Sequence, residues 1–233
     1  MAAPLRLQGW VRGAHKWISL AVGLQALLWM VGGLYMVAVP IGVVHGDRLA
    51  RTERMPLQPA AARLAPGELL ARHPAATGFR LKRLGEREVY EIVQGGTPVL
   101  LDAATGARLG PLSRDAVGQL AARAYLGSGS IQAIDWLNTT PQEAGGRPAP
   151  LWAVRFDDLA KTTLYYSPHT GELLARRHAL WRWFDLFWML HIMDYTARED
   201  VNNPLLRGAS IAGMGAALSG VWLLFYWLRR RLR

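Results

Sequence analysis

Two long uncharged segments dominate the hydropathy pattern, one near each end of the chain. The first runs from Trp17 to Val44 and the second from Gly208 to Leu228, and neither contains Asp, Glu, Lys, Arg or His. At about 1.5 Å per residue, each can cross the roughly 30 Å of membrane hydrocarbon, even if the first helix ends before Pro40. The pattern therefore predicts transmembrane helices over residues 17–44 and 205–228.

The region between these segments looks duplicated, with one copy over residues 60–110 and another over 113–175. Each copy begins with a helical pattern, Pro66–His73 in the first and Ser113–Leu126 in the second. Strand-like runs follow in both. They are Phe79–Leu84, Val89–Gln94, Pro98–Asp102, Ile131–Leu137, Leu151–Phe156 and Thr163–Tyr166. Helices followed by neighbouring strands predict an α+β domain with antiparallel sheets over residues 45–176.

Both copies end in the same kind of turn, Asp102-Ala-Ala-Thr-Gly106 and Ser167-Pro-His-Thr-Gly171. The final glycine provides the positive φ angle that such turns need. A Trp-rich segment over residues 177–194 comes next, with Trp181, Trp183 and Trp188. Aromatic side chains of this kind suit a helix that lies at the membrane interface and anchors the domain.

Charge is distributed unevenly along this basic chain, whose formal net charge is +10. All 17 acidic residues lie between Asp47 and Asp200, whereas residues 1–16 and 229–233 contain only basic charges. The positive-inside rule then predicts cytoplasmic termini, an uncleaved first helix acting as signal anchor, and an external, periplasmic central domain. Because the basic residues are split between two ends that flank apolar runs, we do not predict a nucleic-acid partner.

The composition excludes several kinds of chemistry. The chain has no cysteine, so it can form no disulfide, no cysteine-based zinc site and no covalent c-type haem linkage. It also has no Walker A, HExxH or GxSxG motif. The 6 histidines are therefore the candidate ligands for a cofactor.

His191 is the first candidate. On a helical wheel it lies about 180° from Arg182, among apolar residues that include Phe184 and Trp188. A titratable group on an apolar face needs a partner or a ligand. The alternative to a ligand is a hydrogen bond to Asp194 or to a backbone carbonyl.

His15 and His45 are the other candidates, at the two ends of the first apolar segment. A helix would separate them by about 45 Å, so they cannot bind the same haem in one chain. His45 could share a haem with His191, whereas His15 would need a second subunit or would simply snorkel to the interface. We expect His73 and His169 to be exposed, and His178 to lie on the polar side of the Trp-rich helix.

Three features together resemble the PepSY family in its membrane-associated form: Arg12-Gly-Ala-His15-Lys-Trp17, the segment Trp181–His191, and the duplication with its turns. Larger relatives have four or more spans and include haem-containing ferric-siderophore reductases. The resemblance implies a bacterial inner-membrane protein in which His191, His15 and His45 are candidate axial ligands of haem b. It would pass electrons toward a periplasmic ferric (siderophore) acceptor.

Other roles follow from the same features. Soluble PepSY relatives occur in protease propeptides, which implies an alternative role as a membrane-anchored binding or regulatory module without catalysis. A third possibility is a small subunit that scaffolds a larger complex. Gly208, Ala212, Ala216 and Gly220 recur every four residues and predict close helix packing within the chain or in a homodimer or larger membrane complex. Gln25, inside the first apolar segment, predicts an interhelical hydrogen bond.

Overall fold

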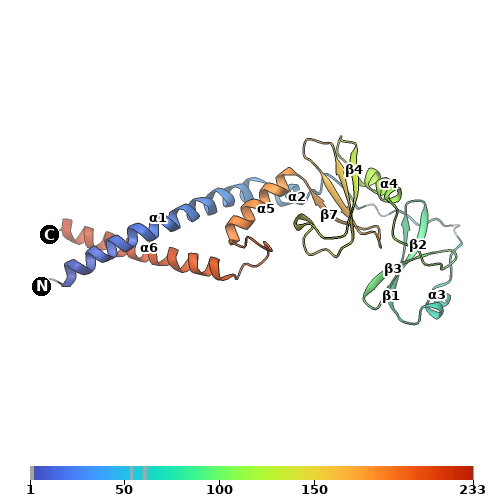
Figure 1. Ribbon diagram of the computed structural model, residues 1–233, viewed down its shortest axis with the longest axis horizontal. Helices are drawn as coiled ribbons and strands as arrows, with labels where there is room; N and C mark the ends of the chain where they lie inside the picture. Colours follow the sequence, from blue (N-terminus) through green and yellow to red (C-terminus); the bar gives the residue numbers. More distant parts are fainter. Residues whose placement is uncertain (1–2, 53–54, 60–61, 233) are drawn as a thin grey trace. The chain divides into compact units, whose positions relative to one another are not determined.

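The computed structural model describes residues 3–52, 55–59 and 62–232. The chain forms two compact units, a helical unit from Met1–Ile41 with Trp183–Arg233 and a central unit from Gly42–Arg182. Figure 1 shows long helices near both termini and a central α+β region with two small sheets. This architecture confirms the predicted arrangement of apolar helices that flank an α+β region.

Within the described residues, two helices are long and apolar enough to cross a membrane, over Gly9–Ala38 and Pro204–Arg231. The first belongs to α1 (Ala3–Ala38) and the second is α6 (Pro204–Arg231). The helix expected up to residue 44 ends at Ala38, because Pro40 lacks an N–H donor and disfavours helical geometry in the residue before it. A short helix, α2 (Ile41–Val44), follows.

The helices α1 and α6 are antiparallel and approach each other over small residues (Figure 1). A Cβ atom at Gly213 would lie 3.6 Å from Val22, and one at Gly220 would lie 3.1 Å from His15. Ala216, between them, is buried. The predicted small-residue packing thus occurs within the chain at this end of α6, whereas a Cβ at Gly208 would meet nothing within 4 Å.

The third helix of this unit is α5 (Ala179–Ile192), which continues into it from the central unit. Its Phe187 packs on α1, 3.5 Å from the position of a Cβ at Gly32 and with its ring 5.0 Å from that of Tyr35. Gln25 donates to the carbonyl of Leu190 at 2.9 Å, which confirms the expected interhelical hydrogen bond. The Trp-rich helix therefore packs along the second half of α1.

The first sheet of the central unit is antiparallel, with strands β1 (Ala76–Leu84), β2 (Arg87–Gln94) and β3 (Thr97–Asp102) in that order. Helix α3 (Pro66–Arg72) precedes it. The three strands match the predicted ones to within a few residues. The buried core of this lobe consists of Leu64, Leu69, Tyr90, Ile92, Leu101 and Ala103.

The second sheet has four antiparallel strands, in the order β4, β5, β6, β7. The first three, β4 (Ile131–Leu137), β5 (Leu151–Phe156) and β6 (Thr163–Tyr166), have the predicted bounds, whereas β7 (Leu173–Arg177) was not predicted. Helix α4 (Arg114–Ala124), capped by Ser113, contributes to the core on one face. A segment with the short helix η1 (Gln142–Ala144) packs in the core on the other face.

The two expected turns have the same structure. In the first, the Asp102 carboxylate accepts hydrogen bonds from the backbone N–H groups of Ala104 and Thr105. In the second, the Ser167 hydroxyl oxygen accepts from those of His169 and Thr170. Gly106 and Gly171 close the turns with φ angles of 74° and 69°. The two turns are alike, but the fourth strand makes the second lobe larger than the first.

Candidate functional site

His15 lies on α1 and faces α6 in the helical unit. Its Nδ1 atom is 2.7 Å from the hydroxyl oxygen of Ser219. The same hydroxyl oxygen is 2.9 Å from the backbone carbonyl oxygen of Ala216. The imidazole is thus linked to the backbone of α6 through one serine.

These two contacts favour one tautomer of the imidazole. Serine has a single O–H proton, and the only assignment that satisfies both contacts sends it to the Ala216 carbonyl. Ser219 then accepts a hydrogen bond from His15 Nδ1–H. In this tautomer Nε2 has the lone pair, which is the arrangement typical of histidines that bind a metal, because a hydrogen bond at the other nitrogen orients the ring.

Gly220 provides the space for this imidazole. A Cβ atom at position 220 would lie 3.1 Å from His15 Cε1 and 3.7 Å from Nε2. Any larger residue would push the ring away from Ser219. Gly220 and Ala216, which sequence analysis assigned to helix packing alone, therefore also position His15.

His191 has a different environment, between α5 and the middle of α1. Trp29 donates its indole N–H to the carbonyl oxygen of His191 at 2.9 Å, and the two rings lie 6.2 Å apart. The Nδ1 atom of His191 is buried and has no hydrogen-bond partner among residues 3–52, 55–59 and 62–232. Neither alternative considered from the sequence, a bond to Asp194 or to a backbone carbonyl, forms at this atom.

Asp194 instead organises the loop between α5 and α6. Its carboxylate accepts hydrogen bonds from the backbone N–H groups of Ala197, Glu199 and Asp200, and from both the N–H and the hydroxyl of Thr196. The hydrogen bonds from Asp200 and Thr196 are the main reason why the pKa of Asp194 is far below its ordinary value. The run Asp-Tyr-Thr is a signal for such a turn, which sequence analysis overlooked.

The three predicted histidines do not form one site. Trp29, the neighbour of His191, is 14 residues beyond His15 on α1, which corresponds to about 21 Å. His15 and His191 therefore cannot bind the same iron atom. His45 belongs to the central unit, where it is exposed after α2.

His178 differs from its expected position on a polar helix face. It is buried, and α5 begins only at the next residue. Its Nε2–H donates to the carbonyl oxygens of Val43 and Val44, at 2.9 and 3.2 Å. Burial lowers the pKa of His178, so the ring stays neutral. The helical wheel was wrong here because this residue lies outside the helix.

No cluster of three or more His, Cys, Asp or Glu side chains suited to a bare metal ion occurs in the part of the chain that the structure describes. A haem needs only one or two protein ligands, because the porphyrin supplies the other four. The orientation of His15 therefore fits an axial ligand of haem, and the buried unpartnered nitrogen of His191 makes it a second candidate.

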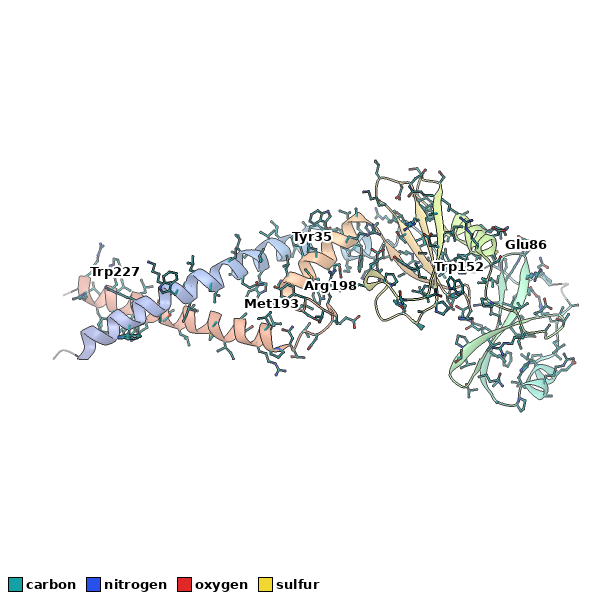
Figure 2. All side chains as sticks on the ribbon, in the orientation of Figure 1. Tyr35, Glu86, Trp152, Met193, Arg198 and Trp227 are labelled. Atoms are coloured by element: carbon teal, nitrogen blue, oxygen red, sulfur yellow. The ribbon has the colours of Figure 1, made fainter. Side chains whose placement is uncertain are left out.

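The central unit also has a groove of about 500 Å³ between the first sheet and α4. Apolar side chains such as Leu84, Val89 and Leu120 line it together with the charged residues Arg87 and Arg123. Glu86, labelled in Figure 2, also lines this groove and forms an ion pair with Arg123 at 2.8 Å. The mixture of apolar and charged groups is typical of binding surfaces.

Comparison with known proteins identifies no family. No protein-family model matches the chain, and no curated protein matches it.

Proposed function

We propose that this protein is a membrane redox component that binds haem b through His15. The observation that supports this proposal is the pair of hydrogen bonds that links His15 Nδ1 to the Ser219 hydroxyl and that hydroxyl to the Ala216 carbonyl. It leaves Nε2 free to bind iron and holds the ring in one orientation.

The residues around His15 have defined tasks in this proposal. Bound haem would supply one-electron chemistry at its iron. His15 Nε2 would hold the iron, while Ser219 orients the ring and Gly220 leaves space for it. Apolar side chains of α1 and α6 would give the haem surroundings of low dielectric constant, which is one factor that sets a haem potential.

If two histidines hold this haem, the second would be His15 of another copy of the chain, since His191 contacts α1 about 21 Å away. His191 and the exposed His45 are each separate candidates for binding a further haem. The basic ends of the chain support cytoplasmic termini and a periplasmic central unit. Electrons would then pass toward a ferric (siderophore) acceptor in the periplasm, as the resemblance to PepSY proteins implies.

An absorbance spectrum tests this proposal. The full chain, produced with ample haem and purified in detergent, should show a Soret band and, after dithionite, an α-band typical of haem b. A pyridine haemochrome assay would give the haem content per chain. A colourless preparation from such cells would contradict the proposal.

The groove in the central unit favours a second candidate function, a membrane-anchored module that binds a periplasmic or membrane partner. Gln119 lines the groove and is exposed, whereas Ala122, on the same helix, is exposed outside it. If this function is correct, a partner should co-purify with the wild type and with Ala122→Trp but not with Gln119→Trp. Equal recovery with both variants would contradict a role for the groove.

A further inference from the structure

An apolar rim lies on the central unit at the two places where the chain enters and leaves it. Residues 43–49 comprise the end of α2 and the turn after it, and residues 176–180 comprise the end of β7 and the start of α5. Together with the loop 157–161 they line a mainly apolar cavity of about 380 Å³. Val43, Leu49, Leu159 and Leu180 are among its lining residues.

These segments are tied to one another. His178 donates to the carbonyl oxygens of Val43 and Val44. The backbone N–H of Ala179 donates to the carbonyl oxygen of Ala160 at 2.7 Å. Gly46 makes the tight turn with a φ angle of 70°, and a Cβ there would lie 3.2 Å from Arg176. The rim is therefore one connected surface formed by three parts of the chain.

Chain connectivity keeps this rim close to the apolar helices. Val43 follows Ala38, the last residue of α1, by five residues, which can span at most about 18 Å. Leu180 lies on α5 three residues before Trp183, where the helical unit resumes. If α1 crosses a membrane, the rim must lie near the membrane surface whatever the orientation of the central unit.

Leu159 is the most exposed large apolar residue of this rim. Its relative exposure is 103%, and that of Leu180 is 40%. Hydrogen bonds hold the loop that presents Leu159 in place, because the Asp158 carboxylate accepts from the Thr162 N–H at 2.7 Å and from the Tyr125 hydroxyl at 2.8 Å. Transfer of this aliphatic side chain from water into an apolar phase would be favourable.

Basic groups accompany the leucines. Arg48 lines the same cavity, and Lys161 follows Leu159 by two residues. Both are exposed, and within the described ranges neither side chain forms an ion pair or hydrogen bond. Of the nearby acids, Asp157 binds Ser130, and Asp47 precedes Arg48. Anionic phospholipid headgroups are the natural counter-charge for unpaired basic residues at a membrane surface.

We propose that this rim binds anionic phospholipid, with Arg48 and Lys161 at the phosphate groups and Leu159 inserted among the upper acyl chains. The rim would hold the central unit against the membrane at the exit of the helices. The proposal needs membrane insertion of α1 and α6 but does not depend on haem.

A fluorescent label at position 159 can test this contact, because the chain contains no cysteine. Leu159→Cys, labelled with the environment-sensitive dye NBD, is placed in nanodiscs of phosphatidylcholine with or without phosphatidylglycerol. We expect blue-shifted emission, and at least twofold quenching by lipids that carry a nitroxide near the headgroup, when phosphatidylglycerol is present. The matched control Ala104→Cys, on the exposed Asp102–Gly106 turn, should show neither effect.

Charge reversal separates the contribution of the headgroups. Adding Arg48→Glu and Lys161→Glu to the labelled protein should remove most of the quenching in phosphatidylglycerol nanodiscs. A label at position 159 that emits as in water and is not quenched in either lipid would overturn the proposal. Equal quenching with and without the charge reversal would overturn the assignment to anionic lipid. Neither result would affect the haem spectrum.

Discussion

Replacing His15 with alanine is expected to remove the haem absorbance of the purified protein. His15 Nε2 is the only nitrogen of this imidazole that can bind iron, since Nδ1 is used by Ser219. Without an axial ligand the apolar helices alone should not retain the haem through purification. We expect haem content, measured by pyridine haemochrome, to fall at least tenfold, while the yield and thermal stability of the chain change little.

Two further variants provide controls for this loss. Ser219→Ala removes the group that orients the ring but leaves Nε2 intact, so haem affinity should fall by about 10- to 100-fold, the usual effect of losing such a partner. His191→Ala should leave the haem at His15 in place and remove only a second haem, if one is bound. Unchanged spectra in both His15→Ala and Ser219→Ala would contradict the assignment of His15.

The second large effect is expected from Glu143→Ala in the central unit. The Glu143 carboxylate accepts hydrogen bonds from the Tyr165 hydroxyl at 2.5 Å and from Arg182 Nε at 2.8 Å. These bonds hold the η1 segment against the second sheet. Breaking a fully buried pair costs about 3–5 kcal/mol. Because the Arg182 and Glu143 side chains are 36% and 25% exposed, we expect a loss of about 2 kcal/mol, measurable by thermal unfolding followed by tryptophan fluorescence.

The same carboxylate should make stability depend on pH. Burial alone would raise the pKa of Glu143, but hydrogen bonds from Arg182 and Tyr165 outweigh it and lower the pKa below its ordinary value. The unfolded chain then binds more protons in acid, so this stabilisation is complete above the ordinary glutamate pKa and decreases as the pH falls toward the folded-state value. Glu143→Gln should reduce this acid sensitivity, whereas Glu68→Gln, at an exposed ion pair on α3, should not.

Much of the fold follows directly from the sequence pattern. Strands β4, β5 and β6 have the predicted bounds because clear turn signals flank their apolar runs. Strand β7 was missed because Leu-Leu-Ala-Arg-Arg lacks alternation and leads directly into the Trp-rich segment. The end of α1 was placed too late because the uncharged run continues past Pro40, where the backbone can no longer remain helical.

The candidate site was only partly predictable. The sequence identified His15 and His191 as ionisable residues next to apolar segments. It could not identify Ser219 as the partner of His15, because the two are 204 residues apart and meet only through the register of α1 and α6. Likewise, the wheel placed His191 on an apolar face, but only the packed helices show that its Nδ1 is buried without a partner within the described chain.

If α1 and α6 cross a bilayer, the register between them has a consequence for the lipids around them. Since His15 packs at Gly220 and Val22 at Gly213, Arg12 and Lys16 lie level with the uncharged part of α6, which continues to Leu228. At the end of the helix pair that carries the two chain termini, the uncharged segment of α6 thus extends further than that of α1. Lipids beside α1 must thin locally, or the two basic side chains must extend toward the headgroups.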